Sequence, residues 1–410
     1  MLTIIKYNLF FPCAVYWPFI LKSMYITTSD QLNDFCKSLE SSDVLAVDTE
    51  FVRERTYFHR IGLIQVAGKE GCGAIDPVLL KDLTPLLEIL KDPSKIKVFH
   101  AARQDLEILV RLCGQVIPPV FDTQVAAALV GWGSQISFAK LIQKALGKHI
   151  HKSETYTDWC RRPLSENQIQ YAIDDVRYLM PAYERLIERL TELKRNDWVA
   201  GEVKIWEDPG TFDLPDPQKR FLKIKSLRSL KPKNLAVLRE LAAWRENVAV
   251  SRDCLAKSIV RDETLLEIAR KMPREAAELS SLRGFYHKEV GKSGAAIIKA
   301  IEKGNAVAEG DLPILPESDG YSTMRGIEEL LSAFVQIRSE ELKIEPSVLA
   351  DRKRIHRFAT HFEQKLDMDE NFLLQGWRRE YIGKPMLSLL KGEVGLKINP
   401  SGAVALIPLK

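Results

Sequence analysis

The stretch VLAVDTEFVRERTYF (44–58) decides the fold of the first part of the chain. Its first four residues form an apolar run of the kind found in buried strands, and two acids, Asp48 and Glu50, follow at once. Side chains two apart in a strand project from the same face, so these carboxylates would repel each other. Either they are surface charges at a strand end, or a cation lies between them.

Strand-like and helix-like segments alternate around this stretch, from Met24 to about residue 200. The sequence predicts strands at 44–48, 62–67, 71–76 and 96–100, and helices at 30–40, 82–91, 103–112, 123–130 and 137–146. Three strands in succession, followed by strand–helix alternation, predict a mixed sheet covered by helices, an α/β architecture. A capping-box pair, Ser165 and Gln168, predicts one more helix that runs to about residue 195.

Two stretches rich in Pro, Gly and Asp, EDPGTFDLPDPQ and AEGDLPILPESDGYS, divide the rest of the chain. Beyond the first, strand signals give way to short amphipathic helices. We therefore predict an N-terminal extension, an α/β domain, a linker, a helical domain, a second linker and a second helical domain, at 1–23, 24–206, 207–218, 219–305, 306–322 and 323–410. The strings CLAKSIVRDETLLEIA and VLADRKRIHRFA suggest that the two small all-α domains are divergent repeats, and the last residues could form a hairpin.

Composition narrows the class of protein only modestly. The net charge of +4 over 410 residues is too small to identify a nucleic-acid binder by itself. Six scattered cysteines without a CxxC pair argue against a zinc site and a disulfide framework, and favour a reducing cytoplasm. The apolar N-terminus is interrupted by Pro12 and Pro18, so we interpret it as a start assigned upstream of Met24 or as a poorly ordered extension, with no membrane span.

Two further acidic positions lie outside the opening stretch. Asp105 falls in the first turn of a predicted helix, where a negative charge is favourable in any case. Tyr171 and Asp175 are four residues apart and share one helical face, whereas Asp174 is rotated by about 100°. Each position alone has an ordinary structural explanation.

Together, the strand-borne DxE, the helix-borne Asp and the helix-borne YxxxD resemble the three motifs of the DEDD exonuclease superfamily, in its tyrosine branch. The flanking segments VDTEFVRERTYF, IGLIQVA, VFHAARQDLEIL, FDTQVAAALVG and TDWCRRPLSENQIQYAIDDVRYL are similar to those of the ribonuclease D family. The resemblance implies a ribonuclease H-like mixed sheet and two divalent ions, Mg²⁺ or Mn²⁺, held by Asp48, Glu50, Asp105 and Asp175. It assigns to Tyr171 the orientation of the attacking water, since a tyrosine hydroxyl is a poor general base at neutral pH.

Basic residues suggest how a substrate is held. The run QKRFLKIKSLRSLKPK (218–233) lacks acids and opens a segment that resembles the HRDC domain of ribonuclease D and RecQ-type helicases, which implies nucleic-acid binding. A solvated helical face is the alternative interpretation. The candidate substrate contacts are Arg53, Tyr57, His100, Lys219, Arg220, Lys223 and Lys225.

Several nearby polar residues have structural interpretations as well. His100 could simply pack at its strand end, and Phe221 in the basic run suits a core better than base stacking. Asp122 is expected to be a helix N-cap, and His149 and His151 to be exposed loop residues.

The function implied is a 3′–5′ exoribonuclease that trims structured RNA, with tRNA precursors as substrates, by two-metal hydrolysis that releases nucleoside 5′-monophosphates. The alternatives are a 3′–5′ exonuclease for single-stranded DNA and a non-catalytic RNA-binding protein on a nuclease fold. The intact set of four acids and one tyrosine argues against the latter. No obligate protein partner is indicated.

Overall fold

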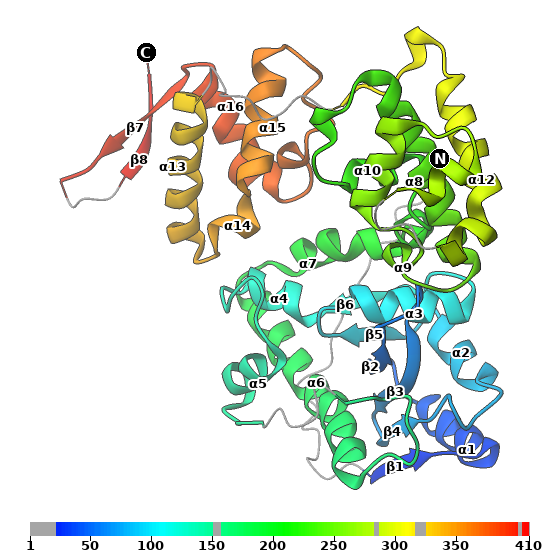
Figure 1. Ribbon diagram of the computed structural model, residues 1–410. Coiled ribbons are helices and arrows are strands. Elements are labelled where there is room, and N and C mark those ends of the chain that lie inside the picture. The colour runs from blue at the N-terminus through cyan, green and yellow to red at the C-terminus, as the bar shows by residue number, and fades with distance from the viewer. Residues whose placement is uncertain (1–21, 151–156, 283–286, 316–324, 401–403, 410) are drawn as a thin grey trace, which may run out of the picture. The chain divides into compact units, whose positions relative to one another are not determined.

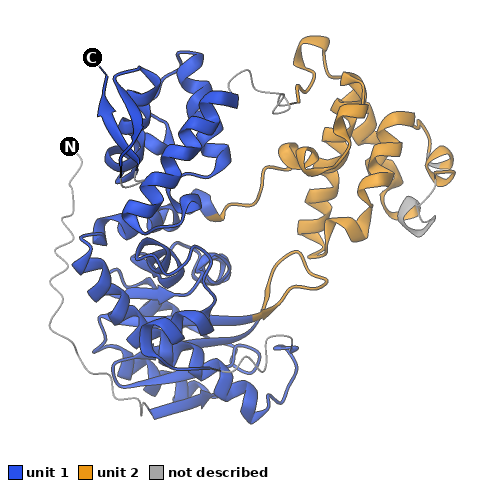
Figure 2. Ribbon diagram, turned by 90° about the vertical axis from the view of Figure 1, so that its left-hand side faces the viewer, with its two compact units in different colours: residues 1–50, 61–211, 322–410 blue, residues 51–60, 212–321 orange. Residues whose placement is uncertain are grey.

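The computed structural model describes residues 22–150, 157–282, 287–315, 325–400 and 404–409. The chain divides into two compact units, coloured separately in Figure 2. Unit 1 consists of residues 1–50, 61–211 and 322–410, and unit 2 of residues 51–60 and 212–321. The short segment 51–60 runs from the end of the strand that carries Glu50 to the start of the next strand, and it is grouped with the first helical region.

Unit 1 is built on a six-stranded mixed sheet of order β1-β4-β3-β2-β5-β6, as predicted from the order of strands and helices. β1 pairs parallel with β4, β3 antiparallel with β4, and β5 parallel with both β2 and β6. The strands are β1 (Lys22–Ile26), β2 (Val44–Val52), β3 (Arg60–Gly68), β4 (Gly71–Ile75), β5 (Ile96–Phe99) and β6 (Val120–Asp122).

Two of these strands were not predicted. β1 begins at Lys22, so it takes in two residues of the segment that we assigned to an N-terminal extension. β6 has three residues, too few to show an alternating pattern. Both lie at the edges of the sheet, where only one neighbouring strand fixes them.

Helices cover both faces of the sheet; in Figure 1, α1 and α2 lie on one side and α5 and α6 on the other. The capping box that predicted α6 is present: the Gln168 amide donates to Ser165 Oγ at 3.2 Å, and the Ser165 amide to Gln168 Oε1 at 2.9 Å. α6 is one helix that includes Pro181. The helices are α1 (Ser29–Leu39), α2 (Thr84–Lys91), α3 (Arg103–Cys113), α4 (Thr123–Leu129), α5 (Phe138–Leu146), α6 (Glu166–Glu192) and α7 (Asn196–Val203).

Unit 2 is helical around a core in which α8 packs against α10 and α12. Phe221, in the basic run, is 5% exposed and belongs to this core, as expected. The run itself forms two 3-10 turns, η3 (Pro217–Lys223) and η4 (Leu227–Ser229), before α8 begins at Pro232. The α-helices are α8 (Pro232–Ser251), α9 (Ala256–Ile259), α10 (Asp262–Lys271), α11 (Ala276–Ser280) and α12 (His287–Asn305), and a further 3-10 turn is η5 (Glu309–Asp311). Two more 3-10 turns, η1 (Lys204–Glu207) and η2 (Pro209–Phe212), lie at the end of the preceding part of unit 1.

The C-terminal segment belongs to unit 1. Its first three helices repeat the order of α8, α9 and α10: a long helix, a helix of four residues, and a longer helix two residues further on. The expected terminal hairpin is present as β7 and β8, which pair antiparallel. The elements are α13 (Arg325–Leu342), α14 (Pro346–Leu349), α15 (Arg352–Glu363), η6 (Phe372–Leu374), the π-helix η7 (Arg379–Gly383), α16 (Lys384–Leu390), β7 (Val394–Ile398) and β8 (Val404–Pro408).

A polar and aromatic contact joins this segment to α7. The rings of Trp198 and Trp377 stack with centroids 4.2 Å apart and planes 5° from parallel. Glu202 accepts hydrogen bonds from Trp377 Nε1 at 2.9 Å and from both terminal nitrogens of Arg378, whose side chain is buried. Because a buried guanidinium needs a counter-charge, this contact fixes the segment to the nuclease part of unit 1.

We expect Glu202→Gln to lower the free energy of unfolding by about 2 kcal/mol, because it leaves the Arg378 charge buried without a carboxylate. The matched control is Glu380→Gln, which breaks an exposed pair with Lys384 in the same segment and should cost less than about 0.5 kcal/mol. Denaturant unfolding of both variants measures the difference. Equal losses would show that the Glu202 contact does not hold the segment in place.

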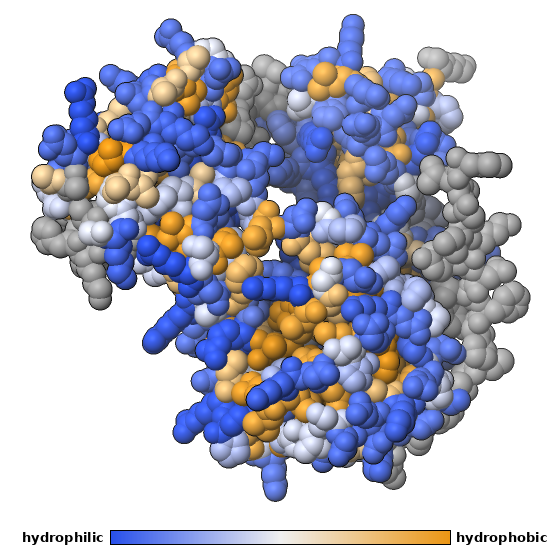
Figure 3. Space-filling model, turned by 90° about the vertical axis from the view of Figure 1, so that its right-hand side faces the viewer, coloured by the Kyte–Doolittle hydropathy of each residue, from blue (hydrophilic) through white to orange (hydrophobic). Residues whose placement is uncertain are grey.

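Polar side chains cover most of the face shown in Figure 3, with apolar side chains gathered in patches between them. Among the described residues, the chain contains no helix of the length and apolarity that a membrane span requires.

Candidate active site

β2 carries two of the predicted acids directly into the middle of the sheet. Asp48 and Glu50 lie on one face of the strand and are half-buried, while Thr49 between them is buried. The strand extends to Val52, four residues beyond the predicted end, so both acids are held by strand geometry rather than by a loop.

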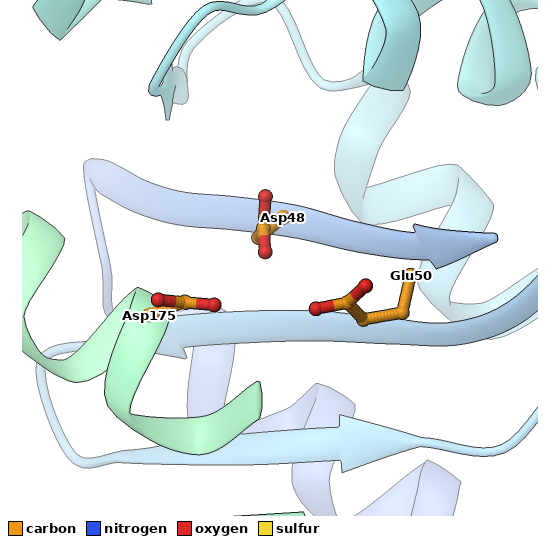
Figure 4. Close-up of side chains that lie close together, drawn as sticks. All are labelled: Asp48, Glu50 and Asp175. Atoms are coloured by element: carbon orange, nitrogen blue, oxygen red, sulfur yellow. The ribbon is translucent and has the colours of Figure 1, made fainter. Parts of the chain in front are cut away.

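α6 supplies the third carboxylate. Carboxylate oxygens of Asp48, Glu50 and Asp175 all lie within 4.8 Å of one another, and Figure 4 shows Glu50 and Asp175 pointing toward each other beside Asp48. Asp174, the neighbour, is turned away: its carboxylate accepts from Arg177 at 3.0 Å and from Gln170 at 2.8 Å. The helical spacing thus selects Asp175 rather than Asp174 for the cluster.

Asp105 enters from the first turn of α3 and is 7% exposed. Its Oδ1 accepts a hydrogen bond of 2.5 Å from the Thr49 hydroxyl, which links it to the strand segment between Asp48 and Glu50. Thr49 was not singled out from the sequence. The only available signal was a polar residue at a buried position of the strand.

Asp122 fixes the entry into α3. As expected, it is the N-cap of α4, where its carboxylate accepts from the amides of Gln124 and Val125. The same carboxylate also accepts from the amides of Ala101, at 3.1 Å, and Ala102, at 2.9 Å, just before α3. One side chain therefore anchors the starts of two helices and so sets the position of Asp105, a second role that the sequence pattern did not reveal.

The group within 4.8 Å comprises Asp48, Glu50 and Asp175, and Asp105 acts on Asp48 and Glu50 through its charge. Burial, and then the charges of Asp105, Asp175 and Glu50, raise the pKa of Asp48 well above its usual range. Burial and the charges of Asp175 and Asp105 raise the pKa of Glu50 to about 9. Burial also raises the pKa of Asp105 to about 7, against the opposing hydrogen bond from Thr49. Gathered carboxylates that repel one another are the donor set that hard divalent cations prefer, so the residues fit divalent metal ions.

Tyr171 lies one turn before Asp175 on α6, and its ring lies 6.1 Å, centroid to centroid, from the ring of Trp159 at an interplanar angle of 32°. His100 sits where β5 ends: its Nδ1 is 3.0 Å from Thr123 Oγ1 and its Nε2 is 3.1 Å from the Ile136 carbonyl oxygen. Both ring nitrogens of His100 are thus engaged within the protein. His149 is exposed, as expected, and His151 lies outside the described residues.

Two residues that we predicted to hold substrate meet within unit 2 on one buried acid. The Tyr57 hydroxyl donates to Glu246 Oε1 at 2.6 Å, and Arg220 Nε contacts the same oxygen at 3.0 Å. Burial and the hydrogen bond to Glu246 raise the pKa of Tyr57 to about 12. The Phe58 amide donates to Asp253, two residues beyond the end of α8. The contacts of Tyr57 and Phe58 therefore attach segment 51–60 to α8 and to the turn that follows it. No motif in the sequence signals this role of Glu246.

The remaining four predicted substrate contacts are exposed. Arg53 lies in segment 51–60, with its Nη1 3.4 Å from His59 Nε2. Lys219, Lys223 and Lys225 are exposed on the basic run of unit 2, and Lys219 is 4.0 Å from Asp216.

Comparisons with known proteins show the family of the chain. Residues 24–191 match the 3′–5′ exonuclease family, and residues 234–301 match the HRDC domain. The ribonuclease D of Granulibacter bethesdensis is 36% identical over 378 residues, 91% of this chain and 94% of that protein. The chain belongs to the ribonuclease D family. The ribonuclease D of Gluconacetobacter diazotrophicus is 37% identical over 377 residues.

A solved structure extends the likeness to the whole fold. The crystal structure of Escherichia coli RNase D, an exoribonuclease involved in structured RNA processing, is similar with a TM-score of 0.80 and 32% identity; the match covers 91% of this chain and 99% of that one. The ribonuclease D resemblance drawn from the motifs is confirmed, and this family member is a 3′–5′ exoribonuclease.

Proposed function

We propose that this ribonuclease D family member trims the 3′ ends of structured RNA, including tRNA precursors, by hydrolysis that depends on two divalent ions, Mg²⁺ or Mn²⁺. The observation that carries the proposal is the cluster of Asp48, Glu50 and Asp175, with Asp105 tied to the same strand through Thr49. The role of Escherichia coli RNase D in structured RNA processing supports the choice of substrate.

The residues of the cluster have distinct tasks in this proposal. Asp48, as the first acid of β2 and the centre of the group, would hold the ions together with Glu50 and Asp175, and Asp105 would complete the set of ligands. Bound there, divalent ions supply Lewis-acid stabilisation of the phosphate and lower the pKa of water. Tyr171 orients the attacking water, and the departing nucleotide leaves as a nucleoside 5′-monophosphate.

Exposed cations hold the RNA. We assign phosphate contacts to Arg53 and to Lys219, Lys223 and Lys225, because exposed Lys and Arg side chains bind phosphate at little desolvation cost. Tyr57, Arg220 and His100 contribute indirectly, since the Tyr57 hydroxyl, Arg220 Nε and both ring nitrogens of His100 are engaged within the protein. The cytoplasm stays our prediction for the compartment, in keeping with the free cysteines among the described residues.

The test compares a tRNA transcript carrying a 3′ extension with a single-stranded RNA and a DNA of the same tail sequence, each with Mg²⁺, Mn²⁺ or chelator. We expect both RNAs to shorten from the 3′ end, the DNA to shorten at least about tenfold more slowly for want of a 2′-hydroxyl, and chelator to stop the reaction. Equal rates on RNA and DNA would support the DNA exonuclease instead. Binding of RNA without any shortening would support the non-catalytic alternative.

A further inference from the structure

The loop that leads into α6 places a tryptophan beside Tyr171. Trp159 is 2% exposed, and its ring centroid lies 6.1 Å from that of Tyr171, within the range of distances of aromatic pairs in contact. Tyr171 is only partly buried, so a neighbouring ring can limit the rotation of its side chain. Trp159 provides such a neighbour on one side of the ring.

Trp159 is itself fixed against β3. A Cβ atom added at Gly62 would lie 2.4 Å from the Trp159 carbonyl oxygen and 2.7 Å from its carbonyl carbon, so only glycine lets the loop approach this closely. The Arg162 guanidinium bridges the two backbones: it donates to the Trp159 carbonyl at 2.8 Å and to the Gly62 carbonyl at 2.7 Å.

Arg162 is in turn held by Asp76, which is fully buried at the end of β4. Two parallel bonds join them, Nε to Oδ2 at 2.5 Å and Nη2 to Oδ1 at 2.7 Å. Asp76 also accepts from the Tyr25 hydroxyl on β1 and from the Val78 amide. This bidentate geometry is the strongest and most directional form of the Arg–carboxylate contact. The loop is therefore clamped to β1, β3 and β4 through one side chain.

We propose that Trp159, held by the Arg162–Asp76 clamp, is a positioning residue that fixes the side chain of Tyr171. The inference rests on the proposed role of Tyr171 in orienting water. Hydrolysis requires that water lie in line with the scissile bond, and small displacements of a positioning group cost large factors in rate. Trp159 restricts where the Tyr171 hydroxyl can be and does not itself take part in the chemistry.

A double-mutant cycle tests the proposal on full-length protein. Trp159→Leu is measured in the wild-type and Tyr171→Phe backgrounds, with kcat and KM on single-stranded RNA. We expect Trp159→Leu to lower kcat about tenfold and to change KM less than about twofold, because ground-state binding is retained. In the Tyr171→Phe background, Trp159→Leu should lower kcat no further. In the wild-type background, Trp159→Phe keeps an aromatic ring at this position and should retain most of the activity.

Controls separate positioning from loss of order in the loop. Leu164→Ala removes another buried side chain of the same loop and should keep kcat within about threefold of wild type, even where it lowers Tm as much. If Trp159→Leu does not fold, Arg162→Lys replaces it, because Lys retains the charge but loses the two-pronged contact; the same pattern is expected.

Any of four outcomes would overturn the inference. Equal losses from Trp159→Leu in both backgrounds, or a rise in KM instead of a fall in kcat, would mean that Trp159 does not act through Tyr171, and the proposed function would stand. A loss from Leu164→Ala that also vanishes in the Tyr171→Phe background would assign the effect to the loop as a whole. A Tyr171→Phe enzyme with wild-type kcat would overturn the water-orienting role in the proposed function and the inference with it.

Discussion

Asp175→Asn is expected to lower kcat on single-stranded RNA by about a thousandfold or more, whereas Asp174→Asn leaves kcat nearly unchanged. The Asp175 carboxylate lies within 4.8 Å of those of Asp48 and Glu50, and Asp174 instead binds Arg177 and Gln170. Loss of one carboxylate charge weakens metal binding and so the stabilisation of the transition state. A thousandfold loss of kcat corresponds to about 4 kcal/mol in the activation free energy.

The two variants form a closely matched pair. Both replace an Asp by Asn in the same turn of α6, so helix propensity and side-chain volume change alike. Single-turnover rates and thermal unfolding, measured together, separate catalysis from stability. A similar loss of kcat in both variants, at unchanged Tm, would mean that helical spacing does not select the acid and that the cluster is wrongly assigned.

Glu50→Gln is expected to have opposite effects on the protein without and with metal. In the metal-free protein at pH 7 it should raise the free energy of unfolding by about 1–2 kcal/mol, because the pKa of Glu50 is raised to about 9 and folding therefore requires this carboxyl to take up a proton, a cost that Gln does not carry. With Mn²⁺ present, the wild type should become at least as stable as Glu50→Gln, because metal binding to the complete set of carboxylates stabilises the folded state. Activity should fall as steeply as in Asp175→Asn.

Thermal unfolding of both proteins in chelator and in a Mn²⁺ titration measures this reversal. Thr49→Val serves as the comparison, because it removes the hydrogen bond to Asp105 and leaves the cluster's charge unchanged; it should not stabilise the metal-free protein. A Glu50→Gln protein that is less stable than wild type in chelator would contradict the view that repulsion dominates the empty cluster.

The sequence predicted what depends on local periodicity. The two-residue repeat of a strand put Asp48 and Glu50 on one face, and the four-residue repeat of a helix selected Asp175 together with Tyr171. The capping box of α6 fixed where that helix begins, and therefore where its side chains point. These features can be recognised in the sequence because each involves residues that are close together in the chain.

Contacts between distant segments could not be predicted in this way. Glu246 draws Tyr57 and Arg220 away from the surface roles that their charge and ring suggested, across 189 positions of sequence in the case of Tyr57. The C-terminal segment joins unit 1 through Glu202 and Arg378, although its composition resembles that of the other helical region. Such pairings depend on burial and complementary charge, which periodicity does not encode.

The most direct test of the account is hydrolysis of single-stranded RNA in ¹⁸O-labelled water with Mg²⁺, followed by mass spectrometry of the released mononucleotides. The account predicts nucleoside 5′-monophosphates that carry one ¹⁸O atom in the phosphate, and no release in the presence of chelator or from Asp175→Asn. Products with a 3′-phosphate or a 2′,3′-cyclic phosphate, or release that persists in chelator, would contradict metal-dependent attack of water at the 3′-terminal phosphodiester.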